Sequence, residues 1–349
     1  MPTCADRGRG RHYAPGVARH FLTGEELAPD ELLALLERGL ALKAARAGAA
    51  GVPDHEGAGR PPGRDAADRP LAGRSVALIF DKPSTRTRVS FEVAVHELGG
   101  HPLVLREGET QLARGESPRD TALVLSRLVH AAGVRTGPQT LLEELAAHAR
   151  VPIVNLLTVE HHPCQALGDL LTLRERFGTL DGVRLAYVGD GNNVAASLML
   201  LGARAGVEVA VATPPELSPA DAVVAAAREG AQGAGTVEVT TDPAAATTGA
   251  HALYTDVWVS MGDEEEAARR RELLAPYRLD GALIAPARPD AIVLHCLPAH
   301  PGEEITEDLL YGERSAVWEQ AENRLHAQKA LLELLLGEET PSTIGERPP

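Results

Sequence analysis

The chain has 349 residues, which is long for one ordinary domain and comfortable for two. Hydrophobic residues make up 44% of the sequence and supply a core, and aromatic residues make up only 3%. The formal net charge of -15 argues against a nucleic-acid partner, and no stretch is apolar enough to predict a membrane span.

The N-terminal segment contains arginines but no apolar region of the kind that a secretory signal needs. We therefore expect residues 1–19 to form a flexible tail of a cytoplasmic protein, with a second tail at 339–349. Leucines at helical spacing predict a helix that starts near Pro29. The next stretch, 48–70, is rich in Gly, Pro and Asp, which indicates a surface loop or insertion.

Strands and helices alternate in the first half of the chain. The predicted elements are strand 76–80, helix 85–98, strand 102–105, helices 119–132 and 138–149, and strand 151–157. The pattern restarts near residue 160. The elements predicted there are helix 165–178, strand 183–188, helix 194–206, and strands 207–214, 252–259 and 291–298, before a last helix over about 321–336.

This alternation predicts an α/β fold of two domains, each a mostly parallel sheet flanked by helices, with helices linking the domains. The expected first domain spans 20–157 and is joined by a C-terminal helix at about 321–338. The expected second domain spans 158–320.

A cluster of arginines and hydroxyls follows the first strand. Backbone N–H groups at a helix N-terminus are unpaired, and the helix dipole favours negative charge there. Hydroxyl donors and guanidinium groups add to this preference, since arginine binds phosphate or carboxylate in a bidentate manner. The residues are Ser84, Thr85, Arg86, Thr87 and Arg88. A capped helix with a solvated first turn is the alternative, but the dense cluster after a buried strand favours an anion site.

The stretch "YVGDGNNVAAS" resembles a dinucleotide-binding turn, with Gly189 and Gly191 after a strand. Val194 stands where a third glycine would be, and the next strand does not end in an acidic residue. We therefore expect no nicotinamide cofactor. Polar contact between a small ligand and Asn192 or Asn193 is the preferred interpretation.

Histidines and cysteines near two other junctions raise the question of zinc. His162 and Cys164 lie in "HHPC", and Cys296 and His300 lie in "HCLPAH". Their spacings match no familiar zinc module. Buried structural residues, or a substrate contact of Cys296 and His162 without metal, are the two other interpretations.

Asp256 and Ser260 are predicted near the C-terminal end of the strand at 252–259, where open α/β sheets bind ligands. An acidic residue there suits an ammonium group. A solvated loop is the alternative for this segment alone.

Together, "STRTRVSFE", "HPCQ", "DGNN", "DVWVSMG" and "HCLP" resemble the signatures of the transcarbamylase family, over about Arg19 to Leu336. The last three resemble the ornithine branch of the family. The resemblance implies transfer of a carbamoyl group from carbamoyl phosphate to the δ-amino group of L-ornithine, which gives L-citrulline and phosphate in arginine metabolism. It also implies a homotrimer with shared active sites and no metal or organic cofactor.

The resemblance implies roles for individual residues, with the first domain binding carbamoyl phosphate and the second binding ornithine. Implied contacts of carbamoyl phosphate are Ser84, Thr85, Arg86, Thr87, Arg88, Gln111, Arg127, His162, Gln165 and Arg324. Implied contacts of ornithine are Asn193, Asp256, Ser260, Met261, Cys296 and Leu297. The implied catalytic residues are Cys296, Arg127, His162 and Arg324. Gln111 is expected to reach into the neighbouring subunit's site.

The sequence departs from the family pattern at Val159 and His161, where Asp and Phe are usual, and in the longer loop at 48–70. Two alternatives accompany the main interpretation. One is a transcarbamylase that uses putrescine, lysine or an N-acylated ornithine, which the "DVWVSMG" turn disfavours because that turn recognises a free amino acid head group. The other is a non-catalytic paralogue, which the presence of every expected contact residue disfavours.

Overall fold

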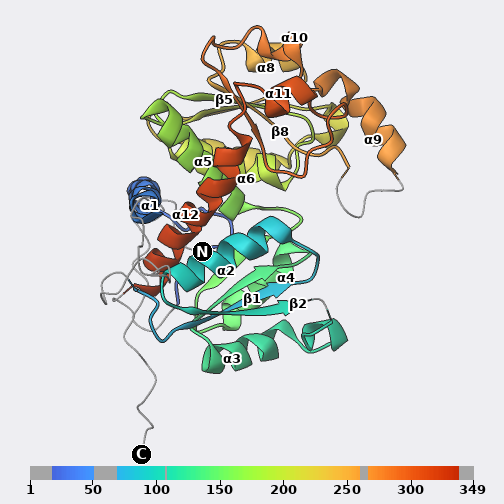
Figure 1. The fold of residues 1–349 in the computed structure, drawn as a ribbon. Helices are drawn as coiled ribbons and strands as arrows, with labels where there is room; N and C mark the ends of the chain where they lie inside the picture. Colours follow the sequence, from blue (N-terminus) through green and yellow to red (C-terminus); the bar gives the residue numbers. More distant parts are fainter. Residues whose placement is uncertain (1–17, 51–68, 107, 260–265, 338–349) are drawn as a thin grey trace, which may run out of the picture. The chain divides into compact units, whose positions relative to one another are not determined.

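The computed structural model describes residues 18–50, 69–106, 108–259 and 266–337. The chain divides into two compact units. Unit 1 comprises Met1–Val159 with Leu325–Pro349, and unit 2 comprises Glu160–Arg324. Each unit holds a parallel sheet flanked by helices, which confirms the predicted α/β class (Figure 1). No helix within the described stretches is long and apolar enough to cross a membrane.

Some expectations concern residues outside these stretches. Of the expected tails, 1–19 and 339–349, the described residues include only the last two of the first. One of them, Arg19, forms an ion pair with Glu31 at 2.8 Å. Most of the expected loop at 48–70 also lies outside the described residues.

Unit 1 contains four parallel strands in the order β2-β1-β3-β4. Strand order reverses at β1, so right-handed connections place α2 and α3 on opposite faces of the sheet, as Figure 1 shows. Side chains of α3 and α4 pack against one face of the sheet and form a buried core with it. The elements of unit 1 in chain order are α1 (Pro29–Ala50), β1 (Ser75–Phe80), α2 (Thr85–Glu97), β2 (His101–Arg106), α3 (Pro118–Leu128), β3 (Ala131–Arg135), α4 (Gln139–His148) and β4 (Ile153–Leu157).

The predicted helix over 119–132 is wrong at its C-terminal end. Helix α3 stops at Leu128, and the next residues form the central strand β3. Alanine and glycine fill the first three positions of this strand, and at Gly133 a Cβ atom would be 2.9 Å from the side chain of Leu156 on β4. Alanine and glycine are poor strand formers by propensity, so tertiary packing, not local preference, decides the conformation here.

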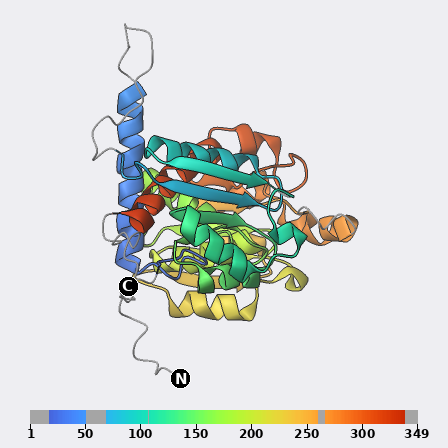
Figure 2. The ribbon, with the colours of Figure 1, turned by 90° about the horizontal axis from the view of Figure 1, so that it is seen from below.

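The C-terminal part of α12 (Val317–Leu336) belongs to unit 1 and lies beside α1, which Figure 2 shows along its length. Arg38 of α1 forms an ion pair with Glu333 of α12 at 2.6 Å. Lys329 of α12 in the same way pairs with Glu97 of α2 at 2.9 Å. Ion pairs thus join α12 to two helices that come early in the sequence, α1 and α2. The helix begins four residues before the position that the sequence predicted.

Unit 2 contains five parallel strands in the order β7-β6-β5-β8-β9. Helices α5 and α6 lie on one face of this sheet, and α8, α10 and α11 lie on the other (Figure 1). The elements of unit 2 are α5 (Pro163–Phe177), β5 (Arg184–Val188), α6 (Asn193–Arg204), β6 (Glu208–Ala212), α7 (Asp221–Glu229), β7 (Thr236–Thr240), α8 (Pro243–Thr247), β8 (Ala252–Thr255), α9 (Ala267–Leu274), α10 (Gly281–Ile284), β9 (Ile292–His295), α11 (Glu307–Tyr311) and the start of α12.

Strand order reverses at the boundary between β5 and β8, which is the point where sheets of this kind bind ligands. The predicted strand over 252–259 is shorter in the structure, since β8 ends at Thr255 and leaves Asp256 just beyond the sheet. The sequence did not predict β7. This strand is at the edge of the sheet and buries only Val237 among its hydrophobic residues, so its apolar signal is weak.

One histidine of unit 1 links the stability of the fold to pH. His20 accepts a hydrogen bond at Nδ1 from the backbone N–H of Ile153, at 3.1 Å. Burial lowers the pKa of His20 below its ordinary value of 6.5. Its contribution to stability is therefore complete above that ordinary value, and is lost as the pH falls from there through the lowered folded-state pKa.

We expect His20→Gln to make the free energy of unfolding less dependent on pH between about 7 and 5, because the titrating group is gone. Urea unfolding of both proteins across this range measures the two slopes. Identical slopes would show that His20 does not carry this linkage.

Candidate active site

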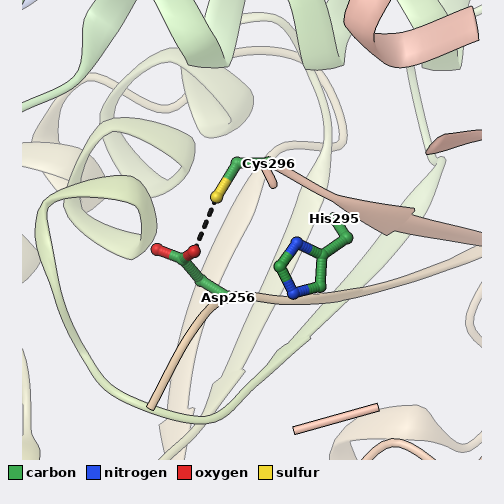
Figure 3. A group of neighbouring side chains, drawn as sticks. All are labelled: Asp256, His295 and Cys296. Carbon is green, nitrogen blue, oxygen red and sulfur yellow. Dashed lines mark hydrogen bonds between the residues drawn. The ribbon is translucent and has the colours of Figure 1, made fainter. Parts of the chain in front are cut away.

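The carboxylate of Asp256 and the thiol of Cys296 meet at the carboxyl edge of the sheet in unit 2 (Figure 3). Asp256 follows β8 and Cys296 follows β9, and these strands are neighbours, so their ends bring the two side chains together. The Cys296 thiol donates to Oδ1 of Asp256, with 2.7 Å between sulfur and oxygen. The backbone N–H of Val257 donates to the same oxygen at 2.8 Å. The buried carboxylate is thereby held in one orientation.

Asn192 supplies the third donor to this carboxylate. Its Nδ2 donates to Oδ2 of Asp256 at 2.8 Å. Its Oδ1 caps α6 by accepting from the N–H groups of Val194 and Ala195 at 2.9 and 3.3 Å. Because the oxygen is engaged by the helix, the amide nitrogen must face Asp256. Asn193, which the family resemblance placed at the ornithine, is the half-buried first residue of α6.

The environment keeps the thiol of Cys296 protonated. Burial raises its pKa well above the ordinary value, and the negative charge of Asp256 raises it further. A neutral thiol donates a hydrogen bond and does not act as a nucleophile. The lone pairs of Asp256 can therefore receive a cationic group beside the neutral thiol.

Asp256, His295 and Cys296 each offer one atom that could bind a metal ion, and these atoms all lie within 4.8 Å of one another. His295 is fully engaged elsewhere: Nδ1 accepts from the N–H of Leu297 at 2.8 Å, and Nε2 lies 3.2 Å from Oε1 of Glu304. Both ring nitrogens are used, so the imidazole offers no free lone pair to a metal ion. This arrangement does not fit a metal centre.

The zinc set considered from the sequence is not brought together in the described residues, where the one candidate metal group is the trio above. His162 and Cys164 are buried around the start of α5, and the side chain of His300 is 53% exposed. Burial raises the pKa of the Cys164 thiol to about 12, so it is not a ready thiolate ligand.

The turn after Cys296 has unusual backbone geometry. Leu297 takes a φ of +59°, a region that non-glycine residues seldom adopt, and a cis peptide bond joins it to Pro298. The N–H of Leu297 is held by His295. The two other residues expected to bind the amino acid head group, Ser260 and Met261, lie outside the described residues.

Unit 1 contains a pocket of about 510 Å³ at the N-terminus of α2. Ser84 is the N-cap residue, yet it makes no side-chain cap hydrogen bond and instead accepts from Nη1 of Arg135 at 3.1 Å. The side chain of Ser84 therefore does not cap this helix end, whose dipole favours an anion. The pocket is lined by Phe80, Lys82, Pro83, Ser84, Thr85, Arg88, Val89, Glu92 and Arg106.

Three of the five predicted anion-binding residues line this pocket, namely Ser84, Thr85 and Arg88. Arg88 forms an ion pair with Glu92, one turn further along the helix, at 2.5 Å. The other two members of the motif do not line the pocket: Arg86 is half-buried and Thr87 is buried.

Two further positive charges line the pocket that were not predicted from the sequence, those of Lys82 and Arg106. Lys82 is two residues before the motif, so proximity was an available signal. Arg106 comes from the end of β2, where it is the register partner of Phe80 on β1. Only knowledge of the strand pairing would have placed Arg106 beside the motif.

Two predicted contacts of carbamoyl phosphate in unit 1 are absent from the lining of this pocket. Gln111 is exposed before a single 3-10 turn, and Arg127 is exposed in the last turn of α3. At the two positions that depart from the family pattern, Val159 is 68% exposed and His161 is buried.

The remaining predicted contacts lie in unit 2, where His162, Gln165 and Arg324 are all buried. His162 begins α5, and its N–H donates to the hydroxyl of Ser197 at 2.8 Å. Arg324 lies on α12 against α5: a Cβ atom on Gly168 would be 2.8 Å from Cγ of Arg324. Glycine at 168 therefore permits the close approach that places this arginine beside α5.

The fold and these two sites define a class of protein: a two-unit α/β protein with an anion pocket in one unit and a fixed carboxylate for a cationic group in the other. Comparison with protein-family models gives a family. Residues 19–175 match the carbamoyl-P binding domain of aspartate/ornithine carbamoyltransferase, and residues 181–335 match its Asp/Orn binding domain. The chain belongs to the aspartate/ornithine carbamoyltransferase family.

Individual relatives agree with this assignment. The chain is 55% identical to the ornithine carbamoyltransferase of Acidothermus cellulolyticus, over 92% of this chain and 97% of the relative. It is 54% identical to the enzyme of the same name from a Parafrankia species, over 95% of this chain and 100% of the relative. Among solved structures, ornithine carbamoyltransferase from Pyrococcus furiosus matches with a TM-score of 0.83 and 44% identity, over 93% of this chain and 99% of that one.

Proposed function

We propose that the protein transfers the carbamoyl group of carbamoyl phosphate to the δ-amino group of L-ornithine, which yields L-citrulline and phosphate. The observation that carries the proposal is the buried Asp256 carboxylate, fixed by Cys296 and Asn192 at a strand end. Such a group suits a cationic substrate. Relatives named ornithine carbamoyltransferase, 54–55% identical over at least 92% of the chain, support the same acceptor.

The pocket of unit 1 suits carbamoyl phosphate. The hydroxyls of Ser84 and Thr85 can donate to phosphate oxygens, and the positive end of the α2 dipole favours negative charge there. The positive charges of Arg88, Lys82 and Arg106 favour a phosphate dianion at the same place. Negative charge grows on the phosphate as its bond to the carbamoyl carbon breaks, so these cations also favour the leaving group.

The acceptor must lose a proton before it can react, since an alkyl ammonium has an ordinary pKa of about 10.4. Its nitrogen then forms a bond to the carbamoyl carbon, while the bond from that carbon to the phosphate oxygen breaks, and the departing phosphate takes the proton that the nitrogen gives up. Asp256 orients the cationic acceptor, and the neutral Cys296 thiol holds Asp256 in place. The assignments of Asn193, Ser260, Met261 and Leu297 to ornithine rest on the family resemblance.

Roles at the carbamoyl group also rest on the resemblance. His162, Arg127 and Arg324 are proposed to stabilise negative charge on the carbonyl oxygen as the amine attacks. Carbamoyl phosphate is already activated, so orientation and charge suffice and no metal or organic cofactor is required.

We also propose a homotrimer in which Gln111 reaches the neighbouring subunit's site, as the resemblance implies. An apolar strip on α3 supports an interface between copies: Leu123, Val124 and Leu128 are 38%, 51% and 70% exposed. A cytoplasmic location and a part in arginine metabolism stay predictions from the sequence.

The test is a product assay with the purified protein. We expect carbamoyl phosphate and L-ornithine to give citrulline and phosphate in equal amounts, identified by mass spectrometry and a phosphate assay. Carbamoyl phosphate binding without citrulline formation would instead identify a non-catalytic paralogue.

A further inference from the structure

A buried carboxylate that the proposed reaction does not use joins α5 to α12 in unit 2. Asp169 of α5 has no exposed surface. Its Oδ1 accepts from Nε2 of Gln165 at 2.8 Å and from Nε2 of Gln320 at 2.7 Å. Gln165 is one turn before Asp169 on the same helix face, and Gln320 comes from α12. One oxygen atom thus holds two buried amides.

The contact with Asp169 decides which way the Gln165 amide points. A carboxylate oxygen only accepts, so the Gln165 nitrogen must face it and the Gln165 oxygen must face the other way. That oxygen, Oε1, is buried and has no hydrogen-bond partner among the described residues. Gln165 therefore presents an unpaired acceptor, and a carbamoyl NH₂ group is a donor that would satisfy it.

The amide of Gln320 links Asp169 to the turn around Cys296, where the amine of ornithine is proposed to bind. Oε1 of Gln320 accepts from the backbone N–H of His295 at 2.8 Å. His295 immediately precedes Cys296, and its ring holds the N–H of Leu297. The three residues that make this connection are each at most 1% exposed, namely Asp169, Gln320 and His295. The position of the turn is therefore coupled to Asp169 through hydrogen bonds that water does not reach.

We infer that Asp169 is a positioning residue for both substrates: through Gln165 it orients the acceptor for the carbamoyl NH₂ group, and through Gln320 it places the His295–Leu297 turn beside the amine. This inference rests on the proposed function. It adds a shared support for two groups of contacts that the sequence motifs treat as separate.

The protonation state of Asp169 does not change this role. Burial raises its pKa to about 7, while the amides of Gln320 and Gln165, the phenol of Tyr254 and the charge of Arg324 favour the carboxylate. A proton on Oδ2 would leave Oδ1 free to accept from both amides. Asparagine, which keeps one accepting oxygen, should therefore replace Asp169 well, whereas leucine should not.

The test compares the steady-state constants of four single variants and one double variant. We expect Gln165→Leu to raise the KM for carbamoyl phosphate, and Gln320→Leu to raise the KM for ornithine, each by about tenfold, as for one lost buried hydrogen bond. Asp169→Leu should raise both constants together, and Asp169→Asn should restore both to within about threefold of the wild-type values. Combining Asp169→Leu with Gln165→Leu should not raise the KM for carbamoyl phosphate beyond that of Asp169→Leu alone.

Thr172→Val is the matched control. Thr172 lies on the same helix, is equally buried, and accepts from Nδ2 of Asn323 on α12 at 3.1 Å. Its loss should lower the melting temperature without moving either KM. Unchanged constants in Asp169→Leu, or equal changes in Asp169→Leu and Thr172→Val, would overturn the inference. Failure of the wild-type protein to form citrulline would instead refute the proposed function.

Discussion

Asp256→Asn is expected to lower kcat/KM for ornithine by about 10- to 100-fold, as for the loss of one charged hydrogen-bond partner, while carbamoyl phosphate binding stays within about threefold. The substitution keeps the shape of the side chain but removes the negative charge that faces the ammonium group. The phosphate group is assigned to the pocket of unit 1, and none of the residues assigned to the carbamoyl group is Asp256, so carbamoyl phosphate binding should not depend on this charge.

The surroundings of Asp256 make the amide a poor substitute. Oδ1 accepts from Cys296 and Val257, and Oδ2 accepts from Asn192. An asparagine has one accepting oxygen, so its NH₂ group must face at least one of these donors. Asn192 cannot turn to compensate without uncapping α6, because its oxygen holds two N–H groups of the helix.

Asp280→Asn is the matched control, since Asp280 also accepts two backbone N–H bonds, as the cap of α10, and asparagine caps helices as well as aspartate. Steady-state kinetics and isothermal titration with carbamoyl phosphate give the required constants. If Asp256→Asn keeps the wild-type kcat/KM for ornithine, Asp256 does not bind the ammonium group.

Arg88→Ala is expected to raise the dissociation constant for carbamoyl phosphate by about 10- to 100-fold, because a charged hydrogen-bond partner of the phosphate is lost. The pairing with Glu92 adds to the effect. Once Arg88 is gone, the carboxylate of Glu92 lines the pocket without its partner and repels the incoming dianion.

Two further variants separate these contributions. Arg88→Lys keeps the charge but loses the bidentate geometry, so we expect an intermediate affinity. In Arg88→Ala with Glu92→Gln, part of the lost affinity should return because the repulsion is removed. Arg119→Ala, at an exposed position of α3, serves as the control for a lost surface charge. Equal affinities of Arg88→Ala and Arg119→Ala would show that this pocket does not hold the phosphate.

The sequence was sufficient where local chemistry and local structure coincide. The hydroxyls and arginines at 84–88 lie at a helix N-terminus after a buried strand, and Asp256 and Cys296 each follow the end of a strand, as their patterns predicted. Each of these features is set by residues within one short segment. The parallel sheets follow from the same alternation of apolar strands and helices.

The features that were missed depend on residues far apart in the chain. The side chain of Leu156 packs on Gly133 of β3, and Arg106 joins the anion pocket through the register of β1 with β2. Asn192 contacts Asp256, which lies 64 residues further along the chain, and the cap of α6 fixes the orientation of its amide. The contact of Asp169 with Gln320 spans 151 residues. Periodicity and propensity carry no information on such pairings.

A competition between acceptors tests the central claim most directly. Equal concentrations of L-ornithine, putrescine, L-lysine and an N-acylated ornithine are offered to the protein with limiting carbamoyl phosphate, and the carbamoylated products are separated by mass spectrometry. A site that pairs buried polar groups with an amino acid head group rejects analogues that lack it, by factors of up to roughly 10⁴. The account predicts that citrulline is almost the entire product. A mixture in which carbamoylated putrescine equals or exceeds citrulline would contradict it.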